Sequence, residues 1–173
     1  MESIKQIFRI GNGPSSSHTM GPKRAAEMFL ARNREVDSFR VTLYGSLAAT
    51  GRGHMTDVAI KSVLEPVAPL EIAWKPEVFL DFHPNGMLFE SLKADGSVIQ
   101  AWTVYSVGGG ALASDDLSDP QPEHVYGMST VSEIQQWCDK QGGSYWEYVQ
   151  QCEGDEIWDY LEEVWRVMVD AVH

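Results

Sequence analysis

Residues 70–111 constrain the fold most, because strand-like segments alternate there with dipeptides that favour tight turns. Strands are predicted over residues 77–83, 87–93 and 97–107. Pro84-Asn85-Gly86 and Ala94-Asp95-Gly96 supply the turns between them, since Asn-Gly and Asp-Gly suit positive φ. We expect His83 to shape the first turn, and the glycines at 108–110 to permit a bulge or a close backbone approach at a strand end. The segment therefore predicts an antiparallel meander.

Two helices and one more strand are predicted before the meander. Pro22 fits the first position of a helix, where its missing N–H costs nothing, and apolar residues at i, i+3 and i+4 extend this helix over residues 22–33. Residues 38–44 alternate and are rich in β-formers, which predicts a strand. Residues 54–64 share one apolar helical face and end before Pro66. We expect the small-residue segments between these elements to be loops.

The C-terminal part is expected to be helical, after a polar connection over residues 113–128. Residues 130–133 and 144–147 have the capping-box spacing, in which two side chains each bind the other residue's backbone N–H. A last, strongly apolar helix begins near Asp155. Because no C-terminal cap marks His173, we expect that the chain is cut before its natural end.

Together these elements predict an α+β fold: a mixed, largely antiparallel sheet with the two early helices on one face, and C-terminal helices. We expect a β-sheet domain over residues 1–155 and the start of a helical linker over residues 156–173. No apolar run reaches the roughly 18 residues of a membrane-spanning helix, and the N-terminus lacks a secretory pattern. A cytoplasmic location is therefore expected, with no membrane partner.

The charge of the chain narrows its ligands. The formal net charge of −12 argues against a nucleic-acid partner, which needs a basic footprint. Residues 1–50 nevertheless carry seven Lys+Arg against four Asp+Glu, which suits a small carboxylate ligand. Cys138 and Cys152 lack the spacing of zinc or iron–sulfur ligands, so we expect no metal site on this chain.

Residues 11–21 form a glycine- and serine-rich segment directly before the first helix. The unpaired N–H groups of a helix start favour an anion, and His18 titrates near neutrality. The hydroxyl groups come from Ser15, Ser16, Ser17 and Thr19. Taken alone, the segment is more typical of a simple helix cap than of a binding site, and His54 is more typical of a cap or a surface residue.

Four segments in this order resemble signature segments of the bacterial iron–sulfur, pyridoxal-independent L-serine dehydratases. They are GPSSSHTMGP at 13–22, YGSLAATG with GHMTD at 44–57, HPNGM at 83–87 and YSVGGG at 105–110. The resemblance implies the family's β domain, similar in fold to the allosteric anion-binding domain of some phosphoglycerate dehydrogenases. The IWDYL segment at 157–161 resembles the linker towards the family's second domain.

The resemblance also implies the reaction and its partners. L-Serine would be deaminated to pyruvate and ammonia, an L-serine ammonia-lyase activity of amino-acid metabolism and gluconeogenesis. A larger α domain, in the same polypeptide or a separate chain, would hold a [4Fe–4S] cluster in its cysteines. This chain would be inactive without that domain, and the enzyme would be a homodimer.

The implied site roles follow from the chemistry of serine. Removing the α-proton needs a positioned base, and expelling hydroxide needs a Lewis acid. His54 is the candidate base, kept neutral by a helix N-terminus, and His18 would orient the substrate. The substrate carboxylate would be held by Ser15, Ser16, Ser17 and Thr19. Asp57, one turn after His54, would complete the pocket and orient that ring.

The sequence also bears on three other classes of protein. A serine hydrolase is disfavoured because no G-x-S-x-G elbow is present. A zinc enzyme built from His18, His54, His83 and Asp81 matches no familiar spacing. The serious alternative is a non-catalytic regulatory domain that binds serine or a small anion. A sensor needs only the hydroxyl-bearing segment, whereas a lyase also needs a neutral histidine within reach of the substrate.

Overall fold

The computed structural model describes residues 1–11, 13–115 and 124–172, and the chain divides into two compact units. One unit is Gly11–Asp119, which contains the sheet, and the other is Met1–Ile10 with Pro120–His173, which is helical. Part of the expected connection over residues 113–128, and the expected uncapped end at His173, lie outside the described residues. The expected boundary at residue 155 stays a prediction.

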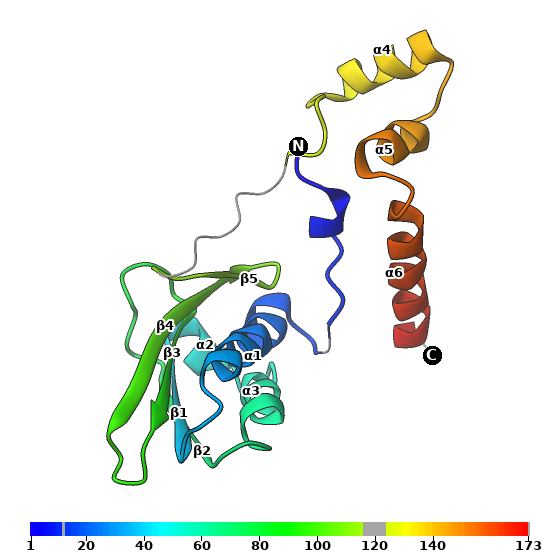
Figure 1. Cartoon of the computed structure of the whole chain (residues 1–173). Helices are drawn as coiled ribbons and strands as arrows, with labels where there is room; N and C mark the ends of the chain where they lie inside the picture. Colours follow the sequence, from blue (N-terminus) through cyan, green and yellow to red (C-terminus); the bar gives the residue numbers. More distant parts are fainter. Residues whose placement is uncertain (12, 116–123, 173) are drawn as a thin grey trace. The chain divides into compact units, whose positions relative to one another are not determined.

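The sheet has five strands in the order β2-β1-β3-β4-β5 (Figure 1). They are β1 (Ser38–Tyr44), β2 (Leu70–Lys75), β3 (Gly86–Leu92), β4 (Val98–Gly108) and β5 (Ala111–Ala113). β1 pairs parallel with β2 and antiparallel with β3, and β3, β4 and β5 continue antiparallel. The prediction of an α+β fold with a mixed, largely antiparallel sheet is confirmed. The similarity to the phosphoglycerate dehydrogenase domain stays a prediction.

Three helices, not two, cover one face of this sheet (Figure 1). They are α1 (Gly21–Arg32), α2 (Gly45–Thr50) and α3 (Thr56–Leu64). The core between helices and sheet includes Ala25, Phe29, Leu47, Ile60, Leu64, Phe39, Val41, Leu43, Met87, Phe89, Trp102 and Val104. The expectation of a loop over residues 45–53 is wrong for residues 45–50, because burying Leu47 and Ala48 stabilises a short helix there.

The prediction of a strand over residues 77–83 is also wrong. Both sides of β1 are already paired, by β2 and β3, so this β-rich segment cannot join the sheet beside β1. It crosses the end of β1 as an irregular segment, where Gly45 N–H donates to the Val78 carbonyl at 2.9 Å. Phe79 and Phe82 remain more than 60 % exposed. The strand that does form in this region is β2, which is short and lies between two prolines. Along the chain, α2 and α3 come between β1 and β2.

The turn predicted at Ala94-Asp95-Gly96 joins β3 and β4, and Gly96 has the expected positive φ of 82°. The prediction that Pro84-Asn85-Gly86 joins two strands is wrong, because no strand directly precedes it, and Gly86 does not have a positive φ.

The predictions for His83 and for the glycines at 108–110 are confirmed. His83 Nδ1 accepts a hydrogen bond from Asn85 N–H at 3.1 Å, which shapes the turn into β3. Gly108, Gly109 and Gly110 all have positive φ, and the register of β4 and β5 shifts between Ser106 and Gly108. This is the expected bulge.

The helical unit contains α4 (Val131–Gln141), α5 (Tyr145–Glu153) and α6 (Ile157–Val172), as well as the short η1 turn (Ile4–Gln6). Both predicted capping boxes are present, at the starts of α4 and α5. None of the helices in the described ranges is long and apolar enough to cross a membrane.

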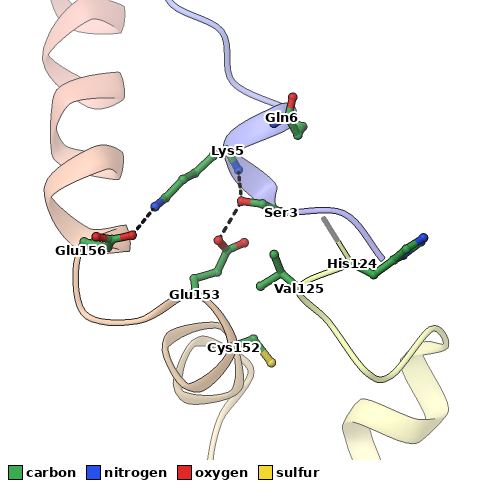
Figure 2. Close-up of a pocket in the computed structure, with 8 residues that line it drawn as sticks. All are labelled: Ser3, Lys5, Gln6, His124, Val125, Cys152, Glu153 and Glu156. Carbon is green, nitrogen blue, oxygen red and sulfur yellow. Dashed lines mark hydrogen bonds and ion pairs between the residues drawn. The ribbon is translucent and has the colours of Figure 1, made fainter. Parts of the chain in front are cut away.

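A hollow of about 510 Å³ opens in this unit (Figure 2). Its lining residues are Ser3, Lys5, Gln6, His124, Val125, Cys152, Glu153 and Glu156. The Glu153 carboxylate accepts hydrogen bonds from Ser3 Oγ at 2.7 Å, Ile4 N–H at 2.9 Å and Tyr126 OH at 2.6 Å. Burial alone would raise the pKa of Glu153, but these donors outweigh it and lower the pKa. Glu153 therefore ties the N-terminal segment to α5.

Candidate functional site

The glycine- and serine-rich segment folds into a helical turn rather than a loop. Residues Ser16–Met20 form one π-helical turn, η2, which leads directly into α1. Ser15 is extended and its Oγ accepts the His18 N–H at 3.1 Å, so it caps the turn. The unpaired N–H groups of the combined helix therefore belong to the turn that starts at Ser16, and not to the start of α1.

His18 is fixed between two serine hydroxyls. Its Nδ1 lies 2.9 Å from Ser17 Oγ, and its Nε2 lies 3.4 Å from Ser46 Oγ in α2. Burial, and next the charge of His54, lower the pKa of His18 below its ordinary value of 6.5. The imidazole of His18 is therefore neutral at pH 7.

His54 lies in the turn between α2 and α3, with its N–H close to the carbonyls of Thr50 and Gly51. The prediction that His54 opens a helix is wrong, because α3 begins two residues later, at Thr56. The residue between them, Met55, has a left-handed backbone conformation with φ 58°. The helix N-terminus therefore does not explain the chemistry of His54. Its ring centroid is instead 5.0 Å from that of His18, with the planes tilted by 52°.

Two threonines connect the segments that carry the histidines. Thr19 Oγ1 donates to the His54 carbonyl at 2.6 Å, and Thr56 Oγ1 donates to the His18 carbonyl. Both threonines are buried. The hydroxyl hydrogen of Thr19 is thus already used within the protein, and the predicted contact of Thr19 with a substrate carboxylate stays a prediction.

The other predicted site residues lie around this centre in different ways. Ser15 and Ser17 contact His18, whereas Ser16 is exposed at the start of η2. Asp57 lies in the first turn of α3, with its carboxylate 4.0 Å from Lys61 Nζ, and it lines a separate hollow of about 290 Å³. The roles of these residues in substrate binding stay predictions.

Sequence reasoning missed three residues that shape the centre. Ser46 faces His18, and its N–H donates to the Pro84 carbonyl at 3.0 Å. Thr56 holds the His18 carbonyl. Ser106 in β4 is fully buried with an unpaired Oγ, and a Cβ built on Gly21 would lie 2.3 Å from that oxygen. All three belong to the family-like segments, which gave the only signal for them.

The four family-like segments therefore meet at one place. η2 lies against β4, α1 and α3, and the turn before β3 reaches Ser46. Among the residues that the structure describes, no three His, Cys, Asp or Glu side chains gather to hold a metal ion. Cys138 and Cys152 are free and lie in the helical unit.

Comparison with known proteins shows the family of the chain. The family model of the serine dehydratase beta chain matches residues 3–75 and 68–117. An L-serine dehydratase of Mycobacterium bovis is 32 % identical over 181 aligned residues, which cover 80 % of this chain and 39 % of that protein. An L-serine dehydratase of Streptomyces coelicolor is 33 % identical, over 96 % of this chain and 48 % of that protein. L-Serine dehydratase 2 of Escherichia coli is 31 % identical, over 97 % and 48 %. The chain spans less than half the length of these curated relatives, and it belongs to the serine dehydratase beta chain family.

Proposed function

We propose that this chain is the β part of an L-serine dehydratase, which deaminates L-serine to pyruvate and ammonia. The observation that carries the proposal is the pair of imidazoles 5.0 Å apart beside serine hydroxyls, in a chain of this family. Hydroxyl and N–H groups at the start of η2 suit the serine carboxylate. An imidazole suits removal of the α-proton.

His54 takes the role of the base in this proposal. The ring of His18 is occupied on both nitrogens by Ser17 and Ser46, while the hydrogen bonds described for His54 are those of its backbone. The His54 imidazole is therefore the better placed to receive a proton from the substrate. His18, held in one orientation, would position the substrate and keep a second positive charge away from His54.

The reaction balances with this assignment. The α C–H bond of serine breaks, its proton goes to the His54 ring, and the electron pair forms the Cα–Cβ double bond as hydroxide leaves. The product aminoacrylate tautomerises to an imine, and water hydrolyses the imine to pyruvate and ammonia. The proton on His54 returns to solvent, so the chain is unchanged after each turnover.

The partner and the cofactor belong to the same proposal. The two cysteines of this chain, Cys138 and Cys152, are too few for the four thiolates of a [4Fe–4S] cluster and lie in different helices. The cluster would be held by a partner α domain, in the same polypeptide or a separate chain. A homodimer in the cytoplasm is the expected working form.

The test is anaerobic serine deamination, scored as pyruvate, for this chain alone and mixed with a reconstituted α domain. We expect pyruvate only in the mixture, and a loss of about 100-fold or more with His54→Ala, as is typical for removal of a general base. His18→Ala is expected to raise KM as well as lower kcat, because His18 positions the substrate. His124→Ala is the matched control, since His124 is an exposed histidine of the helical unit.

Two outcomes would contradict parts of the proposal. Full activity of His54→Ala would move the base to another residue, with His18 next in line. Absence of pyruvate from every mixture, together with serine binding by the chain alone, would reject the lyase and favour a regulatory domain.

A further inference from the structure

At one edge of the sheet that the structure describes, the outer side of a strand has no neighbouring strand. β2 is the terminal strand in the order β2-β1-β3-β4-β5, so within the described sheet only one of its sides has a neighbour. Phe39 N–H of β1 donates to the Pro69 carbonyl at 2.8 Å. By the alternation of a strand, the backbone N–H and C=O groups of Glu71 and Ala73 therefore also face β1. Those of Ile72 and Trp74 face outward. An edge of this kind is a template for another strand.

The side chains of β2 make this edge self-complementary. Glu71 and Lys75 are exposed, opposite in charge and placed symmetrically about Ala73. Ile72 and Trp74 are also symmetric about Ala73, and they lie on the face that packs against the core. A strand with two charges of like sign would repel its own copy, whereas this one matches it.

We propose that β2 pairs antiparallel with β2 of a second copy of this chain, about a two-fold axis at Ala73, to form a ten-stranded sheet. In this register Glu71 lies opposite Lys75 of the other copy, twice, and Ile72 lies opposite Trp74, twice. The outward backbone groups of Ile72 and Trp74 then form the hydrogen-bonded pairs, and Ala73 meets its own copy in a non-hydrogen-bonded pair. Pro69 and Pro76, directly outside β2, end the ladder on both sides.

In other two-fold registers, Glu71 and Lys75 do not lie opposite each other. An axis at Ile72 places Glu71 opposite Ala73, and an axis at Trp74 places Lys75 opposite Ala73, so in both registers these charges face no opposite charge of the other copy. An axis at Glu71 or at Lys75 places like charges face to face, which is destabilising. The charge pattern of β2 therefore selects both the partner, a second copy, and the register.

The first experiment measures the mass of the intact chain in solution by light scattering. We expect about twice the monomer mass of 19.3 kDa. Lys75→Glu creates two like-charge pairs across the axis, as does Glu71→Lys, and each is expected to weaken the dimer about tenfold or more. An equimolar mixture of the two variants restores both opposite-charge pairs, so the mixture is expected to form a heterodimer. A monomeric wild-type chain, or variants that remain dimeric alone, would overturn the proposal.

A cysteine scan tests the register. Ala73→Cys is expected to form a disulfide-linked dimer under mild oxidation, because the two side chains face each other across the axis. Lys75→Cys is the matched control, two residues along on the same face, and is expected not to link to itself. The linked peptide is identified by mass spectrometry, since Cys138 and Cys152 are also present. Linkage through position 75 instead of 73 would reject this register.

This inference rests on the proposed function in one respect only: both take the working form of the protein to be a dimer. Solution mass and pyruvate formation are measured separately, so a monomeric but active chain would reject the interface alone.

Discussion

Thr19 and Thr56 hold the two histidine-bearing segments together in a reciprocal way. Thr19 donates its hydroxyl hydrogen to the carbonyl of His54, and Thr56 donates its own to the carbonyl of His18. The two bonds span 35 and 38 residues of sequence. The distance between the two imidazoles is thus set by a hydrogen bond from a threonine hydroxyl to a backbone carbonyl on each side, and not by contact between the rings alone.

Replacing Thr56 should therefore loosen the site and the fold together. Thr56→Val preserves the shape of the side chain but leaves the His18 carbonyl without its donor, which is expected to cost about 1–3 kcal/mol of unfolding free energy. Urea unfolding followed by fluorescence measures this cost. Thr50→Val is the control, because Thr50 Oγ1 donates within α2 to the Ser46 carbonyl at an exposed position. Equal losses of unfolding free energy in the two variants would show that the hydrogen bond from Thr56 to the His18 carbonyl contributes no more than an exposed hydrogen bond within a helix.

Stability should depend on pH through His18. Its pKa is lowered in the folded chain by burial and by His54, so the unfolded chain binds more protons once the pH falls below 6.5. Unfolding free energy is expected to decrease as the pH falls through 6.5, and to level off below the folded pKa. His18→Gln should flatten this part of the profile, measured by urea unfolding at a series of pH values. Parallel profiles for the two proteins would contradict the assignment.

The close approach of α1 to β4 should tolerate no side chain at Gly21. In Gly21→Ala the new Cβ would lie 2.3 Å from Ser106 Oγ and 3.1 Å from Ser106 Cβ. We expect a loss of about 1–3 kcal/mol, measured by thermal unfolding. Ser106→Gly in the same chain removes both clashing atoms and should recover part of this loss. An undiminished loss in the double variant would place the cause elsewhere than at Ser106.

The N-terminal segment should detach when Glu153 loses its charge. Glu153→Gln weakens three hydrogen bonds, at an expected cost of about 1–3 kcal/mol to the helical unit. Hydrogen exchange of residues 3–10 reports the release directly. The folded pKa of Glu153 is lowered, so its contribution is present above 4.5 and is lost as the pH falls through the folded pKa.

Glu156→Gln is the matched control for this experiment. Glu156 is also acidic and lines the same hollow, but its side chain is 75 % exposed and forms an ion pair with Lys5 (Figure 2). Such surface pairs contribute about 0–1 kcal/mol, so little change in exchange is expected. Equal exchange in both variants would mean that general charge, and not the Glu153 contacts, holds the segment.

The errors of sequence reasoning have a common origin. Residues 77–83 have strand-like side chains, but both sides of β1 are already paired, so the segment cannot join the sheet there. Residues 45–50 have mostly small side chains, but Gly45, Leu47 and Ala48 are buried, and the helix they form contacts β1 and β2. In both cases tertiary contacts overrode local preference. His54 was placed at a helix start because the break at Met55 carries no sequence signal: its left-handed backbone is unusual for a residue other than glycine.

The sequence alone was sufficient for the class of fold, the turn at Ala94-Asp95-Gly96, both capping boxes and the family, because turn and cap chemistry acts over a few residues and family segments are local strings. Tertiary structure decided which distant groups meet. It placed Ser46 against His18, Thr19 and Thr56 across two segments, and β2 at the open edge of the sheet. Such contacts join residues tens of positions apart, and their geometry depends on how helices and strands pack, which no local pattern encodes.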